Sequence, residues 1–335
     1  MKVRKTFGVV AAAVVAAGLL ASLGCPPGNQ GAKPLTIAYS DWPGWLVWEI
    51  ANQKGFCKDA GVDVNFVWYD YLPSMKAFET GNVDAVLVVC GDSLTIAKPS
   101  TAIVLTDYSN GNDMIIGKPE FHSIKDLKGK KVAVEENLVE HILLAKALEK
   151  NGMTESDVTI ESVATDKMPV TLGQSGIAAV GAWYPISGET LKQNPGSAPL
   201  FRSSDAPGLI YDALQVSRES LATRRDDWKK VVGVWFKCLD YLNDPKTHAD
   251  AVKIMAARIK ANPDDLEKNL KGTQLLDKDG NLKALEKRDT LDSVYGSLKN
   301  ANAFYLSHKV YDKAPELDPY VDPSLVKEVI GKSAY

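Results

Sequence analysis

The stretch Leu35-Thr-Ile-Ala-Tyr-Ser-Asp-Trp-Pro-Gly-Trp-Leu-Val-Trp48 joins a short apolar strand to a turn and the start of a helix. Pro43 suits the first turn of a helix, because no hydrogen bond needs its missing N–H there. Asp41 is expected to cap the free amides of that helix, and Gly55 is expected to end it. The stretch therefore predicts a strand at residues 35–39 followed at once by a helix at residues 45–54.

This turn is also the first indication of a binding site. In open α/β sheets, small ligands bind where strands end and helices begin. Trp42, Trp45 and Trp48 all lie within or just after the turn. Trp48 has the spacing of a buried helix face, which indicates a core residue. Trp42 stands beside Pro43 and Gly44, so we expect its ring to face a ligand.

A strand–helix rhythm continues from this point and predicts a first α/β lobe. Its expected strands are residues 35–39, 62–69, 85–89 and 103–107, and its expected helices are residues 45–54 and 72–80. Such alternation is typical of sheets in which the strands run parallel. The motif Asn110-Gly-Asn-Asp113 then interrupts the rhythm, and we expect the chain to leave the first lobe there.

The rhythm restarts in a second lobe, with strands at residues 132–135, 158–163 and 178–182 and helices at residues 137–150 and 168–174. Residues 208–216 are expected to return the chain to the first lobe, and the sequence from residue 226 onward has the periodicity of helices. We therefore predict lobe I at residues 35–113 and 208–335 and lobe II at residues 114–207. The fold class is α/β with parallel-type sheets, a hinge and a helical C-terminal part.

The N-terminus has the features of an export signal. Lys2, Arg4 and Lys5 precede an uncharged apolar run at residues 7–20, and small residues then lead to Cys25. We expect residues 1–24 to be a signal peptide, Cys25 to be lipidated and residues 25–34 to be a flexible linker. Ordinary cleavage after Gly24 and a retained membrane span are the alternatives. The expected location is periplasmic or at the cell surface, with a membrane anchor.

Composition excludes some classes of protein. A net charge of −3 and the lack of a basic stripe give no support to nucleic-acid binding. The four histidines, at positions 122, 141, 248 and 308, show no metal-ligand spacing, and no Cys-x-x-Cys occurs. We therefore expect no metal and no cofactor. Three cysteines remain after Cys25, and we expect no disulfide between Cys57 and Cys90.

Several segments carry a family resemblance: Tyr39-Ser-Asp-Trp-Pro-Gly-Trp45, Lys54-Gly-Phe-Cys-Lys-Asp-Ala-Gly-Val-Asp-Val64, Glu79-Thr-Gly-Asn-Val-Asp-Ala-Val86 and Leu127-Lys-Gly-Lys-Lys-Val-Ala-Val134. They resemble the substrate-binding proteins of nitrate/sulfonate/taurine-type ABC importers. Together with Tyr108-Ser-Asn-Gly-Asn-Asp-Met114, the first segment is most similar to the branch associated with urea carboxylase and guanidine use. The resemblance implies a type II periplasmic-binding-protein fold that closes around a small solute and delivers it to a permease and its ATPase. We expect a monomer.

The ends of the expected strands supply the candidate ligand-binding residues, which are Asp41, Trp42, Trp45, Tyr69, Asp70, Asp92, Ser93, Asp107, Glu135, Trp183 and Asp212. Carboxylates dominate this set. An anion site would favour bare amides, hydroxyls or basic side chains at helix N-termini. In many relatives a Gly-Ser or Gly-Thr pair follows the second-lobe strand, whereas Glu135-Glu136-Asn137 stands there in this chain. This departure argues against an anionic ligand.

A planar cation fits these residues better. Carboxylates accept the N–H groups of guanidinium in pairs, and a Trp face adds a cation–π attraction of about 0.5 to 2 kcal/mol. We therefore expect guanidinium or a urea-like cation. Binding of taurine, another aliphatic sulfonate or nitrate is the alternative, in which the acidic residues simply cap helices.

Catalysis has little support in the sequence. Gly91-Asp92-Ser93-Leu94 matches the nucleophile block of the GDSL-type esterases, but no histidine has an Asp three residues before it to complete the triad. The thiamin-pyrimidine synthases share the expected fold and use a cysteine cluster that this sequence does not contain. We therefore predict a binding protein and not an enzyme.

Overall fold

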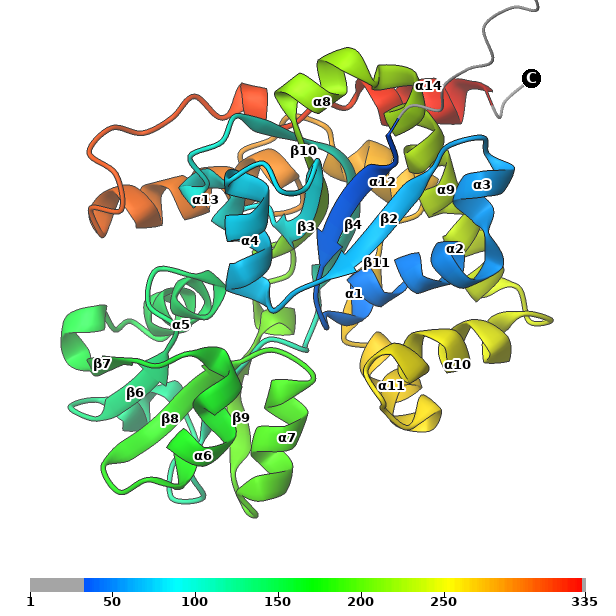
Figure 1. The fold of residues 1–335 in the computed structure, drawn as a ribbon. Helices are drawn as coiled ribbons and strands as arrows, with labels where there is room; N and C mark the ends of the chain where they lie inside the picture. The colour runs from blue at the N-terminus through cyan, green and yellow to red at the C-terminus, as the bar shows by residue number, and fades with distance from the viewer. Residues whose placement is uncertain (1–32, 333–335) are drawn as a thin grey trace, which may run out of the picture. The chain divides into compact units, whose positions relative to one another are not determined.

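The computed structural model describes residues 33–332, which form two β-sheets with helices packed around them (Figure 1). The predicted signal peptide and the predicted lipidation site Cys25 lie outside the described residues. We call the part built on the six-stranded sheet lobe I and the part built on the five-stranded sheet lobe II. Within residues 33–332, no helix has both the length and the hydrophobicity needed to cross a membrane.

The sheet of lobe I has the strand order β11-β4-β10-β3-β1-β2. These strands are β1 (Leu35–Tyr39), β2 (Val64–Trp68), β3 (Ala85–Val89), β4 (Ser100–Ser109), β10 (Tyr211–Ser217) and β11 (Thr273–Leu275). The central strand β3 is buried along its whole length, which explains its uninterrupted apolar sequence. Strands β1, β2, β3 and β4 run in one direction, and β10 runs antiparallel between β3 and β4.

The sheet of lobe II has the order β7-β6-β8-β5-β9. Its strands are β5 (Met114–Gly117), β6 (Lys131–Val134), β7 (Thr159–Ser162), β8 (Ile177–Ala182) and β9 (Ala198–Arg202). Strand β5 runs antiparallel to both β8 and β9, so this sheet is mixed. The sequence pattern predicted parallel-type sheets and did not identify β5 or β9. Each sheet thus contains one strand that adjoins a crossing between the lobes and runs antiparallel to both of its neighbours. This strand is β10 in lobe I and β5 in lobe II.

The chain crosses between the lobes twice, from β4 to β5 and from β9 to β10. The two crossings touch each other, because Ser203 Oγ lies 2.7 Å from Ser109 Oγ and accepts the Gly111 N–H at 2.7 Å. Arg202 adds a hydrogen bond to the Gly111 carbonyl. Gly111 has a φ of 129°, a conformation that favours glycine. This pair of linked crossings is a natural hinge.

The helix expected at residues 45–54 is divided into α1 (Pro43–Leu46) and α2 (Trp48–Lys54). Pro43 occupies the first turn of α1 as expected, and Gly55, with a φ of 70°, ends α2. The expected cap is wrong: Trp42 holds the N-cap position of α1, and no side chain caps it. Asp41 is therefore free to serve another purpose. Trp48 lies in the core against Trp235, with ring centroids 5.3 Å apart.

Further short helices cover the sheets: α3 (Phe56–Asp59), α4 (Tyr71–Glu79), α5 (Val139–Lys150), α6 (Met168–Gly173) and α7 (Ile186–Gln193). Helix α4 packs against β1 and β3, and α5 packs against β5, β6 and β8. The C-terminal part is helical as predicted, with α8 (Arg218–Thr223), α9 (Arg225–Asn243), α10 (His248–Arg258), α11 (Pro263–Leu270), α12 (Lys278–Ala284), α13 (Val294–Ser307) and α14 (Ser324–Lys332). The apolar residues that recur at helical spacing in α9, Trp228, Val231, Val232, Trp235, Phe236, Leu239 and Leu242, are buried.

Candidate functional site

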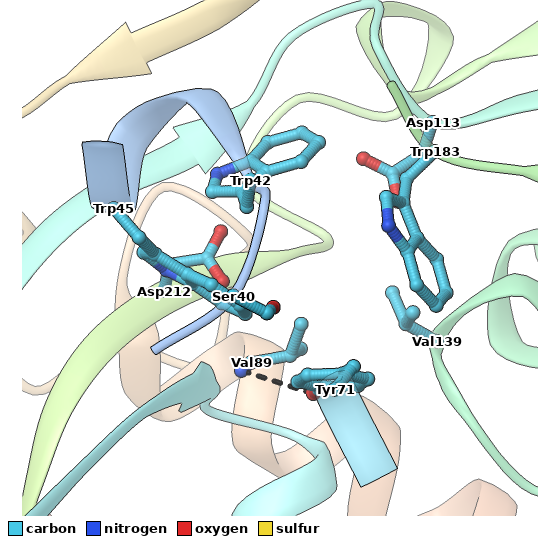
Figure 2. Close-up of a pocket in the computed structure, with 9 residues that line it drawn as sticks. All are labelled: Ser40, Trp42, Trp45, Tyr71, Val89, Asp113, Val139, Trp183 and Asp212. Carbon is cyan, nitrogen blue, oxygen red and sulfur yellow. Dashed lines mark hydrogen bonds between the residues drawn. The ribbon is translucent and has the colours of Figure 1, made fainter. Parts of the chain in front are cut away.

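A small cavity of about 20 Å³, which we call the inner cavity, lies between the lobes at the carboxyl ends of β1 and β3. Its lining consists of Ser40, Trp42, Trp45, Tyr71, Val89, Asp113, Val139, Trp183 and Asp212 (Figure 2). The tryptophan rings of positions 42 and 183 stand on opposite sides of the cavity (Figure 2). The cavity occupies the edge of the sheet at which α/β proteins bind small ligands.

Five buried carboxyl groups, which we call the acid cluster, lie in and behind the inner cavity: Asp92, Asp107, Asp113, Glu140 and Asp212. Asp212 and Asp113 line the cavity itself. Lobe I supplies Asp92, Asp107 and Asp212, Glu140 belongs to lobe II, and Asp113 lies at the boundary between the lobes, directly before β5. The acid cluster is therefore shared between the two lobes.

Asp107 and Asp212 stand directly opposite each other on the antiparallel strands β4 and β10. Like charges in that arrangement repel each other. Burial raises the pKa of Asp107 to about 6. Burial and the neighbouring Asp107 raise the pKa of Asp212 well above its ordinary value. Within residues 33–332, no donor reaches Asp107 Oδ2 or either oxygen of Asp212, so a proton held between the two carboxyl groups is needed to stabilise the pair.

Asp113 and Glu140 form a second pair of the same kind. Asp113 directly precedes β5, and Glu140 lies in the first turn of α5. Burial raises the pKa of Asp113 to about 7, and burial together with Asp113 raises the pKa of Glu140 well above its ordinary value. Asp113 Oδ2 and both oxygens of Glu140 have no donor within the described part of the chain. A buried carboxylate without a partner is costly, so these groups hold protons or bind something positive.

Asp92 differs from the other members, because its two oxygens are satisfied. It accepts hydrogen bonds from the hydroxyls of Tyr71 at 2.7 Å and Tyr305 at 2.6 Å. Burial raises its pKa to about 6, against the opposing effect of these two donors. Asp92 therefore holds α4 and α13 in place and lies outside the lining of the inner cavity.

Asp107 is held by the turn that precedes α1. The indole Nε1 of Trp42 donates to Asp107 Oδ1 at 2.8 Å. Gly44 makes the approach possible, since a Cβ at this position would lie only 2.0 Å from Asp107 Oδ2. The Trp-Pro-Gly sequence of the turn thus orients one carboxyl group of the acid cluster.

A larger cavity of about 340 Å³, which we call the outer cleft, adjoins the inner cavity and shares Ser40, Tyr71 and Trp183 with it. Its acidic lining residues are Asp41, Asp70, Glu135 and Asp166. Burial raises the pKa of Asp41 to about 6, although the neighbouring Trp183 side chain opposes this rise. Glu135 accepts a hydrogen bond from the Thr165 hydroxyl at 2.9 Å. The outer cleft is acidic on both lobes.

The structure places the residues predicted from sequence in four groups. The inner cavity is lined by Trp42, Trp45 and Asp212, and both spaces are lined by Trp183. The outer cleft is lined by Asp41, Tyr69, Asp70 and Glu135. Behind the inner cavity lie Asp92 and Asp107. Ser93 lines neither space and donates its hydroxyl hydrogen to the Cys90 carbonyl at 2.7 Å. It therefore has a local structural contact.

Sequence reasoning missed Asp113 and Glu140, which complete the acid cluster. It considered only residues at the ends of expected strands, whereas Asp113 precedes a strand and Glu140 begins a helix. A usable signal was present, because both acids adjoin strongly apolar runs, Met114-Ile-Ile and Ile142-Leu-Leu. Ser40, Tyr71, Val89 and Val139, which complete the lining of the inner cavity, were missed as well.

Comparison with known proteins identifies the family. The profile of the family described as "NMT1/THI5 like" matches residues 46–247, which is more than half of the chain. The chain belongs to this family. A sequence relative of this NMT1/THI5-like chain is the "Putative binding protein" of Brucella abortus strain 2308, which is 27% identical over 241 residues and covers 70% of this chain and 76% of that protein.

Solved structures share the fold. The ligand-binding component of an ABC-type import system from Staphylococcus aureus has a TM-score of 0.70 and 16% identity, and covers 89% of this chain and 99% of its own. The periplasmic aliphatic sulphonate-binding protein of Escherichia coli has a TM-score of 0.71 and 15% identity. Its alignment covers 88% of this chain and 93% of that protein. The desulfurization enzyme DSZB also has this fold, with a TM-score of 0.61 and 14% identity. Its alignment covers 89% of this chain and 99% of that enzyme.

These neighbours confirm the predicted α/β, two-lobed periplasmic-binding-protein fold. At such identities the likeness shows the fold alone, and the fold occurs in both binding proteins and an enzyme. In this NMT1/THI5-like chain, Cys57, Cys90 and Cys238 are buried and free. The function must therefore be inferred from the inner cavity and the outer cleft.

Proposed function

We propose that this protein is the solute-binding component of an ABC importer and that it binds a small organic cation, best matched by guanidinium, in the inner cavity. One observation carries the proposal: buried carboxyl oxygens without donors face or adjoin the cavity. Among the described residues that line the inner cavity or the outer cleft, none is Lys, Arg or His.

The charge of the lining favours a cation over an anion. A bound sulfonate or nitrate would add negative charge next to Asp113 and Asp212, with no basic side chain in the lining to balance it. A guanidinium ion supplies both the missing charge and several N–H donors in one plane. It can therefore satisfy carboxylates from both lobes at once.

Shape and aromatic lining agree with this choice. Trp42 and Trp183 stand on opposite sides of the cavity, so a flat cation between them lies next to aromatic faces (Figure 2). A cavity of about 20 Å³ suits a very small solute. Guanidinium and urea are compact and planar, whereas taurine adds an ethylene chain and a sulfonate group.

Urea is a second candidate, because one observation favours a solute with a carbonyl oxygen. Trp45 Nε1 and Ser40 Oγ line the inner cavity and have no partner within residues 33–332. Guanidinium offers them no acceptor, whereas urea does. Protonated carboxyl groups could bind urea without any change in ionisation, so pH distinguishes the two solutes. Taurine, an aliphatic sulfonate or nitrate remains the alternative from the fold neighbours.

Binding is favoured over catalysis by the surroundings of Ser93. The GDSL-type esterase reading needs a histidine at its hydroxyl, but that hydroxyl donates to the Cys90 carbonyl. The ring nitrogens of His141, His248 and His308 have other partners. Among the hydrogen bonds of residues 33–332, none joins Ser93 to a histidine that could activate it.

The remaining parts of the proposal follow the sequence. We infer export through residues 1–24, anchoring through Cys25 on a linker at residues 25–34, and delivery of the solute to a permease and ATPase. We also propose that lobe I comprises residues 35–113 and 208–335 and that lobe II comprises residues 114–207. The protein acts as a monomer in this scheme.

Titration calorimetry at pH 8 tests the proposal, with guanidinium, methylguanidine, urea, taurine and nitrate as solutes. Guanidinium should bind, and at about 100 times its Kd it should stabilise the protein by about 2.7 kcal/mol in a thermal-shift measurement. Methylguanidine should bind more weakly, because the inner cavity has little room for a methyl group. Taurine or nitrate binding with no guanidinium signal would refute the cation assignment.

A further inference from the structure

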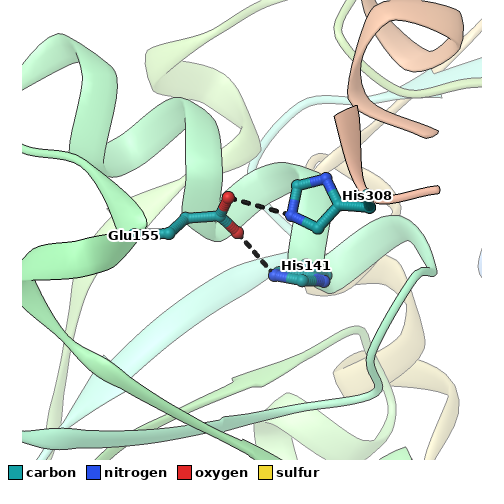
Figure 3. A group of neighbouring side chains, drawn as sticks. All are labelled: His141, Glu155 and His308. Atoms are coloured by element: carbon teal, nitrogen blue, oxygen red, sulfur yellow. Dashed lines mark ion pairs between the residues drawn. The ribbon is translucent and has the colours of Figure 1, made fainter. Parts of the chain in front are cut away.

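His141, Glu155 and His308 come together where the end of α13 meets α5 (Figure 3). His141 belongs to α5, and Glu155 begins the 3₁₀ helix η3 (Glu155–Asp157), both in lobe II. His308 follows α13, which is anchored to lobe I through Ser297 and Tyr305. Glu155 Oε1 lies 2.6 Å from His141 Nε2, and Oε2 lies 2.9 Å from His308 Nε2. The group therefore bridges the lobes.

Hydrogen bonds show where the protons are. His141 Nδ1 accepts the backbone N–H of Asn137 at 3.1 Å, so the hydrogen of a neutral His141 ring is on Nε2, which faces Glu155 Oε1. His308 Nδ1 lies 2.8 Å from the Phe304 carbonyl oxygen, which can only accept, so this nitrogen carries a hydrogen. His308 Nε2 can then donate to Glu155 only if the ring holds a second proton.

The same hydrogen bonds argue against a metal ion. A metal would need a bare nitrogen from each histidine, and ligating histidines usually donate their other N–H to an oxygen. His308 meets this condition, but His141 does not, because its Nδ1 already uses its lone pair to accept a backbone N–H. Two ligands, His308 and Glu155, make a poor site for zinc.

We propose that His141, Glu155 and His308 form a proton-dependent clamp, in which protonated His308 ties lobe I to Glu155 of lobe II and favours the closed protein. When His308 loses its second proton, its Nε2 lone pair faces a carboxylate oxygen and the contact becomes repulsive. Closure is therefore favoured at low pH and weakened at high pH.

The surroundings of Glu155 fit this role. The charged or titratable groups that act on its carboxyl group are His141 and His308. Burial acts to raise the pKa of Glu155, but the hydrogen bonds and charges of the two histidines outweigh burial and hold this pKa below its ordinary value. Glu155 therefore stays ionised in mildly acidic solution. Phe304 stacks on the His308 ring with a centroid distance of 3.9 Å and limits its rotation.

Both helices of the clamp contact the acid cluster. His141 is the neighbour of Glu140 on α5, and His308 lies one turn beyond Tyr305, which donates to Asp92. Closing the clamp therefore sets the position of carboxyl groups from both lobes. The clamp itself does not depend on which solute binds there.

Fluorescence energy transfer between dyes on Gln174 of lobe II and Lys246 of lobe I, both exposed, measures closure without any solute. The closed-to-open ratio of the wild type is divided by the same ratio for His308→Gln. The acid cluster is identical in the two proteins, so its own pH dependence cancels in this quotient and only the effect of His308 remains. This quotient should be about ten at pH 5.5, the scale of one charge-assisted hydrogen bond, and below one at pH 8, where the wild-type contact is repulsive.

Two further variants complete the test. His308→Lys, which keeps its charge, should maintain at pH 8 the closure that the wild type shows at pH 5.5. His248→Gln is the matched control, because His248 pairs with Glu267 within the C-terminal helices, and it should follow the wild type. A quotient that does not change with pH would show a purely structural contact and overturn the clamp. Closure of the wild type by micromolar zinc at pH 8, abolished in His308→Gln, would overturn it in favour of a metal site.

Discussion

Carboxyl groups have opposite surroundings in the acid cluster and in the ion-pair group on α14. Glu328 of α14 pairs with Arg225 and Lys229 of α9, and these hydrogen bonds lower its pKa to about 2. Asp107 and Asp212 have no such partner, and burial raises the pKa of both. The same chain thus neutralises Glu328 with its own cations. Among the described residues that line the inner cavity, by contrast, no basic side chain balances the acids.

The largest effect is expected from a substitution that introduces a steric clash with the acid cluster. Gly44→Ala places a methyl group only 2.0 Å from Asp107 Oδ2. The free energy of unfolding should fall by about 1–3 kcal/mol, the usual cost of overpacking, and guanidinium affinity should fall about 100-fold. Chemical denaturation and calorimetry measure the two effects.

Gly233→Ala is the matched control for this change. Gly233 lies inside α9, and a methyl group on its Cα would meet only the Val329 side chain, at 4.0 Å, so alanine should fit and leave guanidinium binding unchanged. Unfolding should become harder by about 0.5–1 kcal/mol, the normal helical preference for alanine. Equal losses in the two variants would contradict the assigned role of Gly44.

Removing one charge from the cluster should have the next largest effect. Asp212→Asn keeps the shape of the side chain but cannot ionise, so guanidinium affinity should fall about 10- to 100-fold, as expected for a lost charged hydrogen bond. The stability of the solute-free protein should stay the same or rise, because a buried acid without a partner is removed. Glu328→Gln should leave affinity unchanged. A full-strength guanidinium signal in Asp212→Asn would show that Asp212 is not a ligand.

The pH dependence of the two regions should have opposite signs. Because the acid-cluster pKa values are raised, to about 6 for Asp107 and about 7 for Asp113, the folded protein holds more protons than the unfolded chain. The free energy of unfolding without solute should therefore increase as the pH falls from 8 toward 5. Glu328, with a pKa near 2, contributes stability that is lost only as the pH falls from 4.5 toward 2.

Guanidinium affinity should change in the reverse direction, falling about tenfold as the pH drops from 8 to 5.5, since protonated acids no longer attract a cation. Calorimetry across this range checks the sign. Urea provides the contrast, because a neutral solute does not need ionised carboxyl groups. An affinity for guanidinium that rises on acidification would exclude an ionised site.

The smallest effect is expected at the exposed rim of the outer cleft. Asp70→Asn removes an exposed charge that lines this cleft and does not reach the inner cavity. The association rate for guanidinium should fall about two- to threefold at low ionic strength, with little change in the dissociation rate, because the charge steers the cation without holding it. Stopped-flow measurements should show that the difference disappears at high salt.

The strands at the start of each lobe were predictable from sequence, because apolar runs bounded by turn residues leave little choice of structure. Strand β3 has the expected bounds, and β1 does too. The antiparallel strand β5 was not predictable, since its partners β8 and β9 lie more than 60 residues further along the chain. Local pattern contains no information on such distant pairing.

The candidate site was predictable in part for the same reason. Asp41, Trp42 and Asp107 were found because they follow or end strands, where function is common. The pairing of Asp113 with Glu140, and of Glu155 with two distant histidines, arises only when the lobes fold and meet. The break in the first helix at Val47 was also hidden, because every residue around it favours burial.

The division of the acid cluster between the lobes has a consequence for energy use by a transport system. Asp107 and Asp212 lie before and after the two linked crossings, whereas Asp113 and Glu140 lie beyond the first of them, so bending at the crossings separates the two pairs. Under the proposed binding of a cation, repulsion between the ionised pairs favours the open form of the solute-free protein, and the bound cation removes this repulsion. An importer that hydrolyses ATP only in response to the closed form would be protected from idle turnover by electrostatics alone.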